Sequence, residues 1–125
     1  MKKKILVIDD DKNLVEMLKI RLESEGFKVV SAYDGEEGIK KTFKEKPNLI
    51  ILDIMLPGIS GYEVCQKLKD DSKTWDIPVM MLSAKGDLES RFTGLFTGAI
   101  EYMSKPYESR VLMRNIRQML SMDKK

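Results

Sequence analysis

Short hydrophobic runs, each ending at polar residues, constrain this chain more than any other feature. Four such runs are followed, in order, by Asp9 with Asp10, by Asp53, by Ser83 and by Lys105. Short apolar runs bounded by polar residues predict fully buried parallel strands. In an open α/β sheet, ligands bind beyond the carboxyl ends of the strands. We therefore expect three carboxylates, a hydroxyl and an ammonium to meet at one sheet edge, an arrangement suited to Mg²⁺-assisted phosphoryl transfer.

Helical patterns alternate with the hydrophobic runs. The first begins after Asp11, whose carboxylate can cap it, and stops at Gly26. A second strand covers about residues 28–33. Asp34 and Glu37 then have capping-box spacing for a second helix.

The remaining helices carry similar boundary signals. Pro47 ends the second helix, and Ser60 with Glu63 repeats the capping-box spacing for the third. A fourth helix is expected at roughly residues 88–97, and Pro106 suits the start of the fifth. Five β/α units in alternation predict an α/β fold, a doubly wound five-stranded parallel sheet with helices on both faces.

Composition limits the function further. The 125 residues predict one domain, 1–125, and a net charge of +2 gives no argument for direct binding to nucleic acid or membrane. The apolar stretch after the N-terminal lysines is too short for a signal peptide, and nothing approaches a membrane span. A single cysteine, Cys65, excludes an internal disulfide and fits a cytoplasmic location. The absence of histidine excludes a histidine-based triad and a phosphohistidine on this chain.

Four segments together carry a resemblance to a known family. They are residues 7–11 (VIDDD), 52–58 (LDIMLPG), 81–84 (MLSA) and 98–107 (GAIEYMSKPY). Over essentially its whole length, the chain resembles the receiver domain of bacterial two-component response regulators, the CheY-like family. The resemblance implies a flavodoxin-like (βα)5 fold with the strand order 2-1-3-4-5 that CheY has.

The aspartates have a chemistry that can be argued from their positions. Asp53 can attack phosphorus as a carboxylate nucleophile and form an acyl phosphate, although a strand-end aspartate can also simply cap a turn. Asp9, Asp10 and Asp53 would repel one another unless a proton or a divalent cation intervened. We expect Mg²⁺, or Mn²⁺ in its place, bound directly by Asp10 and Asp53, through water by Asp9, and by the backbone carbonyl of Met55.

Other residues would hold the phosphoryl group or report its arrival. The Lys105 ammonium can neutralise a phosphoryl oxygen. Ser83 would donate its hydroxyl to another, with help from the backbone N–H of Ala84. The resemblance implies that Tyr102 is a switch residue that swings inward when the Ser83 hydroxyl is drawn to the phosphoryl group, although a half-buried aromatic on an edge strand is also common.

Three rival functions fit the sequence less well. A flavodoxin-type cofactor binder needs a first loop that accepts phosphate, whereas Asp9, Asp10 and Asp11 would repel one. A haloacid-dehalogenase-like phosphatase needs a second aspartate two residues after its nucleophile, where this chain has Met55. A degenerate receiver that only binds would lack a key residue, and none is missing. We therefore expect a phosphorylation-controlled switch that turns over no metabolite.

The expected partners are a sensor histidine kinase or histidine phosphotransferase, and a downstream protein or output domain. Phosphorylation would change the face formed by the fourth helix, fifth strand and fifth helix, for partner binding or homodimer formation. The chain is either a stand-alone regulator or a receiver cut from a longer one with DNA-binding or nucleotide-cyclase output. Ile100 replaces the first of two acidic residues common before the switch aromatic in winged-helix regulators, which argues against that subfamily.

Two residues are expected to set the lifetime of the phosphorylated state. Met55 and Lys85 lie two positions after Asp53 and Ser83, where side chains would flank the water that attacks phosphorus in line. A methionine offers no strong hydrogen bond, and a lysine cannot accept the proton of that water. We therefore expect slow autodephosphorylation.

Overall fold

A computed structural model describes residues 2–83, 101–105 and 107–122 of the chain. Five parallel strands form one sheet in the order β2-β1-β3-β4-β5, as expected. The strands are β1 (Lys4–Ile8), β2 (Lys28–Ala32), β3 (Leu49–Asp53), β4 (Val79–Ser83) and β5 (Glu101–Ser104). The described helices are α1 (Lys12–Ser24), α2 (Gly35–Glu45), α3 (Gly61–Lys69) and α5 (Ser109–Met122). The helix expected at residues 88–97 lies outside the described residues.

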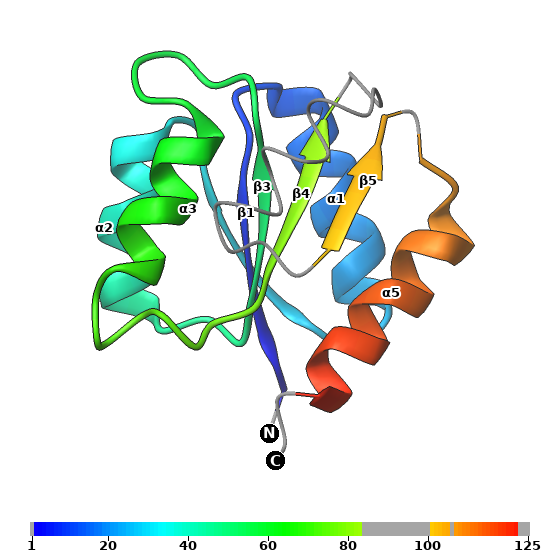
Figure 1. Ribbon diagram of the computed structural model, residues 1–125. Coiled ribbons are helices and arrows are strands. Elements are labelled where there is room, and N and C mark those ends of the chain that lie inside the picture. Colours follow the sequence, from blue (N-terminus) through cyan, green and yellow to red (C-terminus); the bar gives the residue numbers. More distant parts are fainter. Residues whose placement is uncertain (1, 84–100, 106, 123–125) are drawn as a thin grey trace.

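Helices cover both faces of the sheet, with α2 and α3 on one side and α1 and α5 on the other (Figure 1). Successive strand residues point to opposite faces, so Ile5 and Val7 join the core under α1 and α5 while Leu6 and Ile8 join the core under α2 and α3. This double coverage explains why the strands read as continuous hydrophobic runs rather than as alternating patterns.

Strand register brings the polar strand ends to one edge. Ile8 pairs with Leu52, so Asp9 follows on β1 beside Asp53, the last residue of β3. Ser83 on β4 pairs with Ser104 on β5, directly before Lys105. The expected meeting of these residues at one sheet edge therefore follows from in-register parallel pairing.

Most of the expected helix boundaries are confirmed. Asp11 caps α1 by accepting a hydrogen bond from the Leu14 N–H, and α1 stops before Gly26, which has a φ of +95°. Ser60 and Glu63 form the capping box of α3.

Two boundary expectations need correction. The α2 capping box is incomplete, because the Glu37 carboxylate accepts from the backbone N–H of Tyr33 and not from that of Asp34. Helix α5 begins at Ser109 and not at Pro106. Tyr107 packs against the hydrophobic core first, and Glu108 then supplies the carbonyl that accepts the Leu112 N–H.

A glycine sets the approach of α3 to the end of β3. The N–H of Gly61 donates to the carbonyl of Ile54 at 2.9 Å, and a Cβ at this position would overlap the backbone oxygen of Asp53. Only glycine lets the start of α3 lie this close to β3. The contact fixes the backbone that carries Asp53.

Candidate functional site

The site is built around Asp53, which is only 5% exposed at the end of the central strand β3. Its Oδ1 lies 3.6 Å from the Lys105 Nζ and accepts a long hydrogen bond of 3.4 Å from the backbone N–H of Met55. The carboxylate is therefore almost completely buried.

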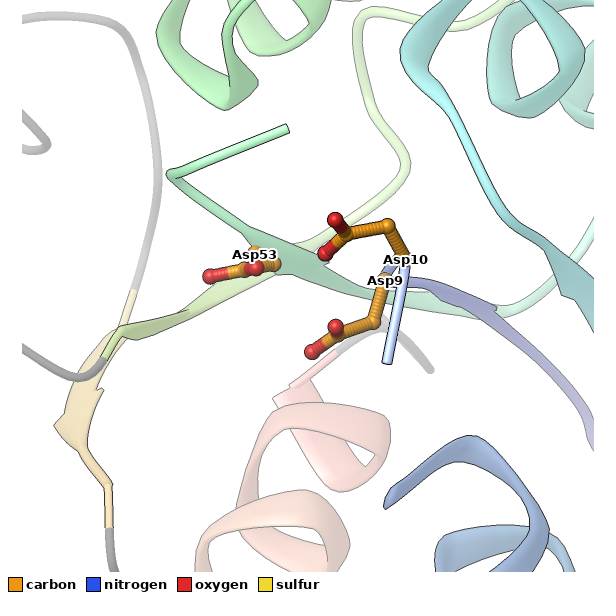
Figure 2. Close-up of side chains that lie close together, drawn as sticks. All are labelled: Asp9, Asp10 and Asp53. Atoms are coloured by element: carbon orange, nitrogen blue, oxygen red, sulfur yellow. The ribbon is translucent and has the colours of Figure 1, made fainter. Parts of the chain in front are cut away.

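Asp9 is the most enclosed carboxylate of the site, at 2% exposed. It accepts hydrogen bonds of 2.9 Å from the Lys105 ammonium and from the backbone N–H of Asp11. The neighbouring Asp10 is exposed. Figure 2 shows the three carboxylates, Asp9, Asp10 and Asp53, gathered from the ends of β1 and β3.

The electrostatics of the site are dominated by excess negative charge. Burial, and then the charge of Asp9, raise the pKa of Asp53 to about 6, against the lowering effect of Lys105. Burial by itself would lower the pKa of Lys105, but the hydrogen bond and charge of Asp9, together with Asp53, outweigh it and raise that pKa. The single positive charge of Lys105 therefore offsets only part of the negative charge of the three carboxylates.

This donor set fits a hard divalent cation. One carboxylate oxygen from each of Asp9, Asp10 and Asp53 lies within 4.8 Å of the others. Carboxylate oxygens are the ligands that Mg²⁺ takes in proteins, and a cation would offset both the burial of the Asp53 charge and its repulsion by Asp9, which together raise the pKa of Asp53. The acidic group can therefore bind a metal ion.

The described residues account for only some of the expected contacts. Tyr102 lies on β5, is 7% exposed and belongs to the core under α2 and α3. Met55 is 60% exposed beside Asp53. The side chain of Ser83, and Ala84 and Lys85, fall outside the described residues, so their roles stay predictions.

Sequence reasoning missed three contributors to the site. Gly61 allows the close approach of α3, and the Asp11 N–H orients Asp9. Half-buried Tyr107 lies near enough that burial, and then the charge of Asp9, raise its pKa. Neither Gly61 nor Tyr107 has a sequence signal of its own, because each acts through a contact made in three dimensions. The hydrogen bond from the Asp11 N–H to the Asp9 carboxylate could have been predicted from the sequence, because aspartate side chains commonly accept a hydrogen bond from the backbone N–H two residues later.

Comparison with known proteins identifies the class. The family model of the response regulator receiver domain matches residues 5–117. The chain therefore belongs to the response regulator receiver domain family. The CheY-like receiver domain protein of Methanospirillum hungatei JF-1 superimposes with a TM-score of 0.92 and 32% identity, covering 98% of this chain and 97% of that one.

The curated relatives are transcriptional regulators. The "Probable transcriptional regulator ycf27" of Cyanophora paradoxa is 46% identical over 119 residues, which cover 95% of this chain and 48% of the relative. The alkaline phosphatase synthesis transcriptional regulatory protein PhoP of Bacillus subtilis is 42% identical over 120 residues, 96% of this chain and 49% of the relative. The chain thus spans about half the length of these relatives. These names describe transcriptional regulators and leave the argument from Ile100 against the winged-helix subfamily untested.

The described part of the chain contains no helix long and apolar enough to cross a membrane.

The raised pKa of Asp53 predicts a stability effect that depends on pH. With a folded-state pKa of about 6 against an ordinary value near 4, the ionised carboxyl destabilises the folded state above pH 6. Below pH 4 the carboxyl is protonated in both states and this cost vanishes. In chelator, Asp53→Asn should therefore stabilise the protein by about 1–2 kcal/mol at neutral pH, less than the full shift implies because solvent reaches the site.

Urea unfolding of both proteins at several pH values measures this difference. It should shrink as the pH falls through 6 toward 4. Glu16→Gln, which removes an exposed carboxylate from α1, is the control and should show no such trend. A difference that grew as the pH fell would contradict the argument.

Proposed function

We propose that Asp53 accepts a phosphoryl group from a sensor histidine kinase or a histidine phosphotransferase, and that this switches the domain. The observation that carries the proposal is the buried Asp53 carboxylate lying 3.6 Å from the Lys105 ammonium and beside two further carboxylates. The chain catalyses its own phosphoryl uptake and loss and turns over no metabolite. A cytoplasmic location suits both the donor and the free thiol of Cys65.

The chain's own residues account for the acceptor chemistry. A pKa of about 6 leaves Asp53 mostly ionised at neutral pH, so its oxygen can attack phosphorus while the phosphorus–nitrogen bond of a phosphohistidine breaks. The donor imidazole leaves with that electron pair. Lys105, now 2.9 Å from Asp9, needs only a small movement to reach a phosphoryl oxygen on Asp53. Ser83 and the Ala84 N–H would hold the other oxygens.

A divalent cation, Mg²⁺ or Mn²⁺, would be held by Asp10, Asp53 and the backbone carbonyl of Met55, with Asp9 acting through water. Asp10 is exposed and free to bind directly, whereas Asp9 is occupied by Lys105. When bound, the cation would offset the charge of the carboxylates and of the phosphoryl oxygens.

Tyr102 would report the phosphoryl group to partners. It lies on β5, three residues before Lys105, so one short strand links the phosphate-binding end to the face that includes α5. Phosphorylation would shift an existing equilibrium of this face toward the form that binds a partner or a second phosphorylated copy. The names of the relatives favour transcriptional regulation as the output, and one of them, RpaA of Synechocystis, is named as DNA-binding. We therefore favour a DNA-binding output domain, with a stand-alone or nucleotide-cyclase regulator as the alternative.

The acceptor assignment predicts a single modification. Incubation with acetyl phosphate and Mg²⁺ should add one phosphoryl group, because the Asp9 carboxylate is already held by Lys105 and by the Asp11 N–H, whereas Asp53 lies at the end of the central strand with Lys105 at 3.6 Å. Intact-mass analysis measures this, and Asp53→Asn should remove the added mass. The control Asp34→Asn, at the cap of α2, should be phosphorylated normally. A second carboxylate modified to a similar extent would refute the assignment.

The metal proposal predicts unequal effects of the two neighbouring aspartates. Asp10→Ala should weaken Mg²⁺ binding by about tenfold or more, because it removes a direct ligand, and Asp9→Ala should weaken it less. Isothermal titration calorimetry of the unphosphorylated chain measures both affinities. Equal affinity in the wild type and Asp10→Ala would remove Asp10 from the metal site.

The lifetime proposal predicts slow loss of the phosphoryl group. Exposed Met55 offers the attacking water no strong hydrogen bond, and Lys85 offers only a donor. Met55→Asn combined with Lys85→Glu should speed decay by about tenfold, equivalent to about 1.4 kcal/mol of barrier. Loss of label after removal of the donor measures the rate. Decay of the wild type within seconds, or no acceleration in the double variant, would refute the proposal.

A further inference from the structure

Two cavities, which together we call the α2/α3 groove, are lined by residues of α2, α3 and the loop before α3. These two helices lie on the sheet face opposite α1 and α5 (Figure 1). The main cavity of the groove has a volume of about 490 Å³ and is lined by Glu36, Ile39, Lys40, Ile59 and Lys67. A second cavity of about 360 Å³ shares Glu36 and Ile59 and continues toward the loop between β3 and α3. The groove is therefore long enough for more than one side chain of a partner.

The groove combines an apolar floor with a rim of net positive charge, in which Lys40 and Lys67 outnumber one exposed acid, Glu36. Half-buried Ile39 and Ile59 form the floor, and Phe43, one turn further along α2, is 38% exposed. Lys40 and Lys67 are exposed on the rim, and neither is in an ion pair with any of the described residues. A matching partner would present a convex apolar surface flanked by carboxylates.

The chain itself carries such a surface on α1. Met17 is 66% exposed and Ile20 is 60% exposed, and their spacing places them side by side on the outer face of the helix. Glu16 and Glu23 are exposed next to Ile20, at i−4 and i+3, and neither is in an ion pair within the described part of the chain. We call these four residues the α1 ridge.

We propose that the α1 ridge of one copy binds in the α2/α3 groove of a second copy. Met17 and Ile20 would enter the 490 Å³ cavity over Ile39 and Ile59, and this burial would supply the attraction. Glu16 and Glu23 would face Lys40 and Lys67, which fixes the orientation of the two copies.

The positions of ridge and groove dictate the form of the assembly. They lie on opposite faces of the sheet, so each bound copy leaves one ridge and one groove free. Such a head-to-tail contact adds further copies, as a ring or as an open chain, and does not close as a two-fold dimer. A contact of one helix with one groove is small, so association should be weak, with a dissociation constant on the order of 100 µM.

Sedimentation equilibrium of the unphosphorylated chain in chelator and low salt tests this independently of the proposed function. The average mass should rise from the 14.4 kDa monomer and continue past the dimer as concentration approaches millimolar. A mass that stays monomeric, or one that stops at the dimer, would overturn the proposal.

Charge reversal locates the contact. The groove variant Lys40→Glu/Lys67→Glu should weaken association by about tenfold or more, and so should the ridge variant Glu16→Lys/Glu23→Lys. An equimolar mixture of the two variants should associate again, because the reversed ridge then faces the reversed groove. A third variant, Lys2→Glu/Lys73→Glu, changes the net charge as much as the groove variant does and should associate normally.

Two results of the charge-reversal experiment would exclude this pairing. One is unchanged association of the groove variant, and the other is a mixture that does not associate although thermal melts show both variants folded. In the second case the ridge and groove would be surfaces for other proteins and not for each other.

Discussion

The placement of one ammonium between two buried carboxylates is the interaction on which the site depends. Asp9 and Asp53 are nearly inaccessible, and without Lys105 their charges would be buried without compensation. Burial, then the charge of Asp9 and to a smaller extent that of Asp10, raise the pKa of Asp53, because the single ammonium does not fully compensate the carboxylates. The excess negative charge suits the site to bind a divalent cation, and a phosphoryl group together with that cation. Without them, the buried negative charge lowers the stability of the folded domain.

The surrounding backbone holds this arrangement in place. The N–H groups of Asp11 and Met55 donate to Asp9 and Asp53, and Gly61 lets α3 lie against the end of β3. Asp9 and Asp53 therefore lie at the ends of strands that are buried by helices on both faces, and each receives a backbone hydrogen bond from two residues further along the chain. Under the proposed function, a sheet edge of this kind would present a preorganised acceptor, and a phosphoryl group would change the charge balance at that edge.

Local sequence signals predicted the starts and stops of most described helices correctly. They failed where a contact with a residue outside the local pattern competed with it. Asp11, Ser60 and Gly26 act as caps and stops through bonds within a few residues, so their patterns predicted the structure correctly. Pro106 was a reasonable helix start by local preference, yet α5 begins later because Tyr107 packs against the core first. The Glu37 carboxylate likewise accepts its hydrogen bond from the backbone N–H of Tyr33, one residue before the Asp34 N–H that the capping-box spacing predicted.

The sequence by itself determined the fold class, the strand ends and the meeting of the three aspartates with Lys105, because hydrophobic runs specify buried parallel strands and parallel strands share one carboxyl edge. Tertiary structure alone decided how the charges are shared. Lys105 pairs more closely with Asp9 than with Asp53, Asp53 is buried enough for its pKa to rise, and Gly61 makes room for α3. These properties depend on distances and burial between residues far apart in the chain, which no local pattern encodes.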